Sequence, residues 1–114
     1  MKEIRIKRIY EPVEKDDGFR VLIDRLWPRG IKKEKAHYDE WIQSVAPSTS
    51  LRKWFAHDPA KWNAFREKYK AELHQTGAIS ELKSILEKHS RITLLYAAKD
   101  EQHNHAIVLQ QLLR

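Results

Sequence analysis

The chain has 114 residues, of which 41% are hydrophobic and 33% charged, and it contains no cysteine. These values are typical of one globular domain spanning residues 1–114, long enough to bury a core without a stapling disulfide or metal. The lack of cysteine excludes disulfides, thiolate catalysis and cysteine zinc sites, and it is typical of a reducing compartment. No stretch resembles a signal peptide or reaches the ~20 apolar residues of a membrane span, so we expect a cytoplasmic protein without membrane contact.

Basic residues outnumber acidic ones by 22 to 16, which gives a formal net charge of +6. Such an excess favours anionic partners such as phosphates, nucleotides or nucleic acid, although a solvated surface of mixed charge explains it equally well. Part of the excess is concentrated in a basic segment of eleven positions, where Glu34 is the one acid. The basic side chains of this segment are Arg25, Arg29, Lys32, Lys33 and Lys35.

Two strands are predicted in the first quarter of the chain. Residues 3–9 alternate between isoleucine and charged side chains, which is typical of a half-exposed strand near a sheet edge. Residues 10–18 form a loop, because they contain the turn-forming sequence Asp16-Asp17-Gly18. Residues 19–24 form the second strand. Their apolar run, residues 21–23, does not alternate, so we expect both faces of this strand to be covered, as in a parallel sheet.

The middle of the chain is predicted to contain short elements. Residues 31–36 suit one or two helical turns, whereas residues 38–45 are compatible with a third strand or with a short helix. Ser48 or Ser50 caps a helix that runs through Ala56. The inward side chains of this helix are expected to be Leu51, Trp54 and Phe55.

The second half alternates helices with one strand. Asp58-Pro59 starts a longer helix, since aspartate is a preferred cap and proline suits the first helical position. Gly77 ends that helix, and Ser80 caps the next. Residues 91–98 form the central strand, and Asp100 or a neighbour caps the last helix. The side chains expected to be buried are Trp62, Phe65, Tyr69, Leu73, Leu82, Ile85, Leu86, Ala106, Leu109, Leu112 and Leu113.

Strands that alternate with helices predict an α/β domain. We expect a small, mainly parallel sheet of three or four strands with helices packed on it, in a Rossmann-like three-layer arrangement; the periodicity leaves the strand order open. Ligands of open parallel sheets sit beyond the carboxyl ends of the strands, near the point where the strand order reverses. The two strands predicted to be central end at Asp24 and Ala98, so the loops after them define the predicted site.

Charged and polar side chains gather in these two loops. If the strands are parallel neighbours, the loops share one edge with the start of the last helix, whose free N–H groups and dipole favour an anion. Arginine offers a permanently charged, planar fork for phosphate or carboxylate, and histidine exchanges protons near neutral pH. The candidates for handling protons, as catalytic residues, are Asp24, Asp100 and His105. The ligand-binding candidates are Arg25, Trp27, Arg29, Lys99, His103 and Asn104.

Each candidate also has a structural interpretation. Asp24 and Arg25 can pair with neighbouring groups and close the end of the sheet, and Trp27 can cover the core rather than stack on a ligand. Asp100 is a natural helix cap. A metal is not expected, since the two histidines of residues 103–105 would point about 200° apart on a helix, converging only if the helix starts after His103, and no other ligand motif accompanies them. No cofactor is expected, because the chain lacks a Walker loop, a dinucleotide fingerprint and a nucleophile elbow.

Three motifs resemble a known family. Residues 20–30 read Arg-Val-Leu-Ile-Asp-Arg-Leu-Trp-Pro-Arg-Gly, and residues 46–59 and 94–106 continue the match. The similarity covers essentially the whole chain and resembles the YeaO-like proteins, small bacterial proteins of domain of unknown function 488. That family has no agreed biochemical activity to carry over. In longer members of the wider family, a Cys-His pair falls where Asn104-His105 stands here, which implies that His105 is a better candidate than His103 and excludes a thiol-dependent role.

Three classes of function remain in competition. The favoured one is binding, with enzymatic processing left open, of a small anionic or phosphate-bearing ligand at the carboxyl ends of the central strands, where Arg25 and Arg29 would clamp the anion. An alternative is a nucleic-acid-binding module. The basic segment and the tryptophans support this alternative. Against it, Trp41, Trp54 and Trp62 occupy positions expected of a core. A protein-interaction domain is the third, and the oligomeric state is left open.

Overall fold

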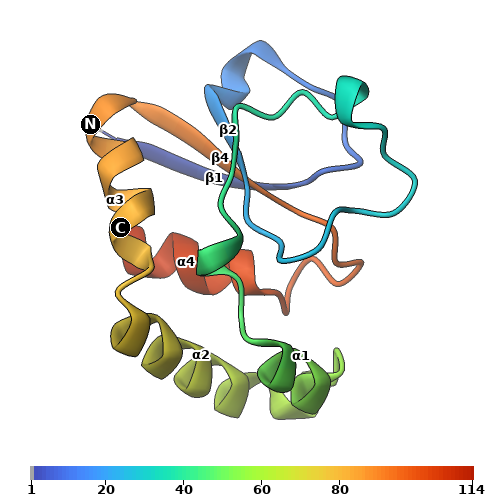
Figure 1. Ribbon diagram of the computed structural model, residues 1–114, viewed down its shortest axis with the longest axis vertical. Helices are drawn as coiled ribbons and strands as arrows, with labels where there is room; N and C mark the ends of the chain where they lie inside the picture. The colour runs from blue at the N-terminus through green and yellow to red at the C-terminus, as the bar shows by residue number, and fades with distance from the viewer. Residues whose placement is uncertain (1) are drawn as a thin grey trace.

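The computed structural model describes residues 2–114. Four strands form one parallel sheet in the order β1–β4–β2–β3 (Figure 1). The strands are β1 (Glu3–Arg8), β2 (Phe19–Leu22), β3 (Glu40–Trp41) and β4 (Arg91–Tyr96). The helices are α1 (Thr49–Phe55), α2 (Trp62–Thr76), α3 (Ile79–Lys88) and α4 (His105–Leu113). The predicted α/β class and the small parallel sheet are therefore confirmed.

Strand β4 lies inside the sheet between β1 and β2, and β1 is an edge strand, both as predicted. The pairing places Leu22 opposite Leu95, so apolar side chains of neighbouring strands share a face. The ambiguous segment 38–45 contains both elements that were left open. Its first part is the two-residue strand β3, and a 3-10 turn follows at Gln43–Val45. Another single 3-10 turn occupies Lys33–Lys35.

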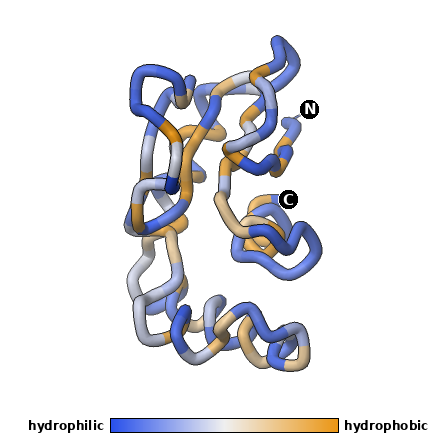
Figure 2. The backbone as a smooth tube through the Cα atoms, turned by 90° about the vertical axis from the view of Figure 1, so that its right-hand side faces the viewer, coloured by the Kyte–Doolittle hydropathy of each residue, from blue (hydrophilic) through white to orange (hydrophobic). Residues whose placement is uncertain are grey.

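The two faces of the sheet are covered by different kinds of structure. All four α-helices contribute to the larger apolar cluster on one face, with side chains such as Tyr69 and Leu109. The smaller cluster on the other face is built on Leu22 and Leu95 and closed by loop side chains such as Trp27. Figure 2, turned by 90° from Figure 1, shows helical segments at the bottom of the molecule and hydrophilic loops at the top. The three-layer, Rossmann-like packing is therefore not confirmed, since loops take the place of one helical layer.

Cap chemistry sets several helix ends as the sequence predicts. The Ser48 hydroxyl accepts the N–H of Leu51 at 3.1 Å at the start of α1. Asp58 Oδ1 accepts the N–H of Ala60 at 3.0 Å in the 3-10 turn that leads into α2. Gly77 ends α2 with a φ of 68°, a conformation that favours glycine.

Three expectations about the helices are wrong. The Ser80 hydroxyl does not cap α3 but donates to the carbonyl of Gly77, and Ala78 occupies the cap position. Trp54 is 38% exposed and Leu112 is 37% exposed, so neither is a core residue. Their helices present other side chains to the core, because the tertiary packing decides which face of a short helix is buried.

Gly18 is the residue whose substitution tests this packing most sharply. Its φ is 67°, and an added Cβ would collide with the carbonyl oxygen of Arg91 in β4. We expect Gly18→Ala to lower the free energy of unfolding by about 3 kcal/mol or more, because the backbone strain adds to the collision. Gly30→Ala is the matched control: its φ is 78°, no described atom lies within 4 Å of the new Cβ, and it should cost about 1 kcal/mol. Equal losses in urea unfolding would contradict the prediction.

Candidate functional site

The ends of β2 and β4 meet at the carboxyl edge of the sheet. The N–H of Ile23 donates to the Leu95 carbonyl at 3.1 Å, and the N–H of Ala97 donates to Asp24 Oδ2 at 3.1 Å. The chain after β2 runs toward β3, whereas α4, which follows β4, packs on β1. The connections therefore diverge between β2 and β4, which is where open parallel sheets bind ligands. The predicted adjacency of the two strand ends is confirmed.

Asp24 and His105 form a pair at this point. His105 Nε2 lies 3.1 Å from Asp24 Oδ1 and 3.1 Å from the Ile23 carbonyl oxygen. Because a carbonyl can only accept, Nε2 carries the hydrogen of that bond. Asp24 Oδ1 is buried and has no well-aligned hydrogen bond among residues 2–114, although the ring nitrogen stands beside it. The side chains of Asp24 and His105 are only 17% and 13% exposed, so the pair is largely shielded from solvent.

Asp100 and His103 form a second, separate pair in the loop before α4. Asp100 Oδ1 accepts the N–H groups of Gln102 and His103 at 2.9 and 3.0 Å, and Oδ2 lies 2.9 Å from His103 Nδ1. The Gln102 N–H and then the His103 side chain lower the pKa of Asp100 below its usual range. Asp100 thus caps a turn in the loop, and the His103 ring packs edge-on against Trp62.

Asn104, rather than Asp100, is the cap of α4. Its Oδ1 accepts the Ile107 N–H at 3.2 Å, and its Nδ2 donates to the Asp100 carbonyl at 3.0 Å. The side chain is buried, with 3% of its surface exposed. Both ends of the amide therefore make hydrogen bonds within the protein. Asn104 has a structural role as the helix cap, whereas the sequence predicted a contact with a ligand.

Arg25 is also bound internally. Its Nε donates to the Pro47 carbonyl at 3.2 Å and its Nη2 to the Ala46 carbonyl at 3.0 Å. The guanidinium thereby holds the segment that enters α1 against the end of β2. Two of the three guanidinium nitrogens already donate hydrogen bonds to these carbonyls. Within residues 2–114, only Nη1 of Arg25 makes no hydrogen bond and is left to bind an anion as predicted.

Three predicted residues remain: Trp27, Arg29 and Lys99. Trp27 belongs to the smaller core cluster, and the other two side chains are exposed to solvent. Trp27 donates from Nε1 to the Ile31 carbonyl at 2.6 Å and packs edge-on against Tyr38 and Trp41, so it covers the smaller core cluster. Arg29 and Lys99 are exposed. Neither forms an ion pair with any residue of the described range 2–114.

Sequence reasoning missed Arg8, which belongs to the same edge. It ends β1, and its Nε and Nη2 donate to the carbonyls of Ala98 and Ala97 at 2.8 and 3.2 Å. The guanidinium also lies 4.8 Å from the centre of the Tyr10 ring. A parallel edge strand delivers its last side chain to the shared carboxyl edge, so the charge at the end of β1 was the available signal.

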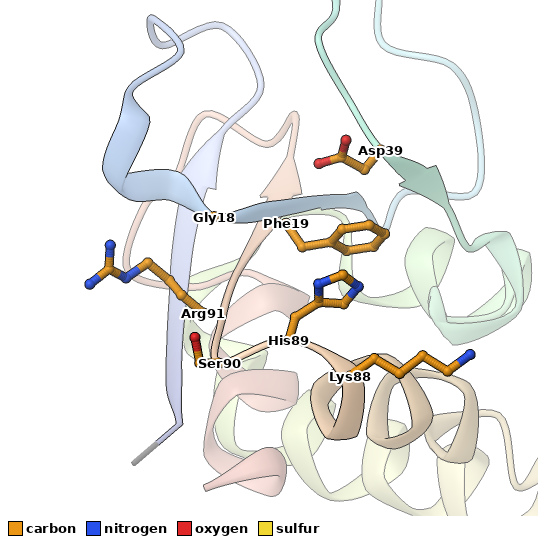
Figure 3. Close-up of a pocket in the computed structure, with 7 residues that line it drawn as sticks. All are labelled: Gly18, Phe19, Asp39, Lys88, His89, Ser90 and Arg91. Carbon is orange, nitrogen blue, oxygen red and sulfur yellow. The ribbon is translucent and has the colours of Figure 1, made fainter.

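Two cavities lie away from this pair. One, of about 630 Å³, sits at the opposite end of the sheet, where the rings of Phe19 and His89 stack at 4.0 Å below Asp39 (Figure 3). The other, of about 430 Å³, lies between two loops. Neither is lined by Asp24 or His105. Within residues 2–114, no cluster of three metal-binding side chains occurs, and no helix is long and apolar enough to cross a membrane.

The fold and the edge together define a class: a small parallel α/β domain with an aspartate–histidine pair at the switch point of its sheet. Residues 3–114 match a family profile described as "Inactive DUF488-N3 subclade". YeaO of Escherichia coli strain K12, an uncharacterised protein, is 47% identical over 111 residues, which are 97% of this chain and 96% of YeaO. The chain belongs to the YeaO-like DUF488 family, and the resemblance of its motifs is confirmed.

Mycobacterial relatives extend the comparison. The uncharacterised proteins Rv3073c of Mycobacterium tuberculosis and Mb3100c of Mycobacterium bovis are each 41% identical over 110 residues, which are 96% of this chain and 92% of each relative. No solved structure matches the chain. The relatives cover nearly the full length, so the whole domain, rather than one motif, is shared.

We expect Asp24→Ala to lower the free energy of unfolding by about 2 kcal/mol or more, because the substitution leaves the Ala97 N–H without its acceptor and removes the carboxylate beside the His105 ring. Asp100→Ala is the matched control, since it removes a carboxylate from the same edge whose partners all lie within its own loop. Guanidinium unfolding of the two variants measures the difference. A smaller loss in Asp24→Ala than in Asp100→Ala would show that Asp24 does not hold the strand ends together.

Proposed function

We propose that this protein binds a small anionic, phosphate-bearing ligand, without converting it, at the carboxyl edge between β2 and β4. The observation that supports this most is the state of the charges there. Both acids of the predicted site face groups of the protein itself. Asp24 accepts the Ala97 N–H at one oxygen, and its other oxygen lies beside the His105 ring. Asp100 binds the N–H groups and the ring of its own loop. The cations of the same edge remain partly or wholly free.

Besides the exposed Arg29, three cationic side chains retain binding capacity. In Arg8 and in Arg25, Nε and Nη2 donate hydrogen bonds to backbone carbonyls. The Nη1 of each makes no hydrogen bond within residues 2–114. Lys99 is exposed and forms no ion pair there. The amino end of α4 adds the partial positive charge of its first turn. A guanidinium with a free terminal nitrogen, an ammonium and a helix amino end recognise phosphate by the same charge-assisted hydrogen bonds.

The lack of cysteine, which excludes a thiol nucleophile, favours binding over catalysis. The chain has no cysteine, and its resemblance to the wider family implies that Asn104 stands where longer members of that family carry one. The Asn104 amide is buried and engaged at both ends, so it serves the helix cap. The description of the subclade as inactive agrees with this arrangement.

Binding is tested by thermal denaturation with inorganic phosphate and a panel of nucleoside and sugar monophosphates, against sodium chloride at matched ionic strength. A ligand at about 100 times its Kd should stabilise the fold by about 2.7 kcal/mol. Lys99→Ala should weaken binding about fivefold, or ~1 kcal/mol. Lys83→Ala, an exposed lysine of α3, is the control and should bind like the wild type.

Two results would overturn the proposal. One is the same stabilisation by phosphate and by sodium chloride in the wild type. The other is a single-stranded oligonucleotide that binds far more tightly than every mononucleotide, with an affinity that falls steeply as salt rises, which would make the protein a nucleic-acid-binding module.

A further inference from the structure

The cavity of about 430 Å³ lies on the loop-covered side of the sheet, between residues 9–13 and residues 30–37. The Tyr10 hydroxyl donates to the Arg29 carbonyl at 2.9 Å, which ties the two loops together. This volume falls within the range of about 300–1,000 Å³ found for small-molecule sites. Neither Lys99 nor His105 lines the cavity, and the inference does not rest on the proposed function, although Arg8 of the carboxyl edge lies against the ring of Tyr10, which is part of the lining.

The lining of the cavity carries an excess of positive charge. Arg20, Lys32 and Lys35 line it, and Glu11 is the one acid among its lining residues. Glu11 already accepts the N–H of Arg8 at 2.9 Å. Lys32 and Lys35 form no ion pair with any residue in the range 2–114. Two lysines without acidic partners beside a concave surface favour an anion.

Arg20 gives this charge a fixed position. The side chain is buried, with 4% exposed, and its Nε donates to the His37 carbonyl at 2.6 Å while Nη1 pairs with Asp17. Nη2 makes no hydrogen bond within residues 2–114. A guanidinium held at two of its nitrogens loses little further freedom when the third binds a ligand, which is the condition under which arginine recognises phosphate or carboxylate well.

Asp17 belongs to a small network of ion pairs. Its Oδ1 lies 3.1 Å from Lys7 Nζ, and that ammonium also pairs with Glu14 at 2.8 Å, so the network balances its own charge and the excess at the cavity comes from Lys32 and Lys35. Burial by itself would raise the pKa of Asp17, but the Glu14 N–H, Lys7 and Arg20 bind the carboxylate and lower the pKa overall. Asp17 is thus held ionised as the anchor of Arg20.

Apolar side chains form the rest of the wall. Tyr10 and Val13 line the cavity and are 44% and 48% exposed, which is high for residues of their size and type. Ile9 and Ile31 also line it. We propose that this cavity binds a small organic anion, with a carboxylate or monophosphate head at Arg20 and Lys35 and an apolar, ring-sized body against Tyr10 and Val13.

Two-dimensional amide NMR of the intact chain tests the site with phenyl phosphate and benzoate as probes. Inorganic phosphate serves as the probe that lacks an apolar ring. Saturable shifts are expected for residues 9–13 and 30–37. Inorganic phosphate should bind these residues at least about tenfold more weakly, because it lacks the apolar contact. Comparison of the two organic probes shows whether the site takes phosphate or carboxylate.

Matched variants keep the test specific. Lys35→Glu should weaken the organic probe at least about fivefold, whereas Lys83→Glu, with the same change of charge on α3, should not. Lys99→Ala should leave binding here unchanged, and this separates the site from the carboxyl edge. Shifts confined to residues 97–106, no saturable shift at residues 9–13 and 30–37, or equal effects of Lys35→Glu and Lys83→Glu would overturn the inference.

Discussion

The carboxylate of Asp24 connects three segments that are distant in sequence. One oxygen accepts the N–H of Ala97 just after β4, and the other stands beside the ring of His105 at the start of α4. The backbone of the same segment receives the His105 hydrogen at Ile23. One side chain thereby fixes the carboxyl ends of the two inner strands and the beginning of the last helix.

This use of the acid changes what the edge can do. A carboxylate and an imidazole engaged with each other and with the backbone contribute structure, and Asn104 is committed to the helix cap. The groups left over include Lys99 and one terminal nitrogen on each of Arg8 and Arg25, with Glu101 as the exposed acid of the same loop. These cations are the basis of our proposal that the edge binds an anion without converting it. The asymmetric covering of the sheet has a separate effect, because loops in place of a helical layer leave a cavity beside Arg20.

Several features of the site could be predicted from the sequence, since they depend on local patterns. Two uninterrupted apolar runs, each followed by charged residues, indicated that Asp24 and the loop before His105 would meet at one edge. The partners of Arg25 could not be predicted, because the carbonyls of Ala46 and Pro47 lie more than twenty residues away and no periodicity encodes such a contact. The inward orientation expected for Trp54 was wrong for a similar reason: α1 has only 7 residues, so tertiary contacts decide which face is buried. The cavity between residues 9–13 and 30–37 depends on two loops without any repeating pattern.

Hydrogen exchange at the amide of Ala97, measured residue by residue by NMR, tests most directly whether Asp24 holds the edge together. Ala97 lies one residue beyond β4, where no partner within the sheet protects its N–H. The account predicts exchange at least about a hundredfold slower than in an unstructured chain. It also predicts that this protection is lost in Asp24→Ala while the amide of Leu94 keeps its own. An Ala97 amide that exchanges freely in the wild-type protein would contradict the account.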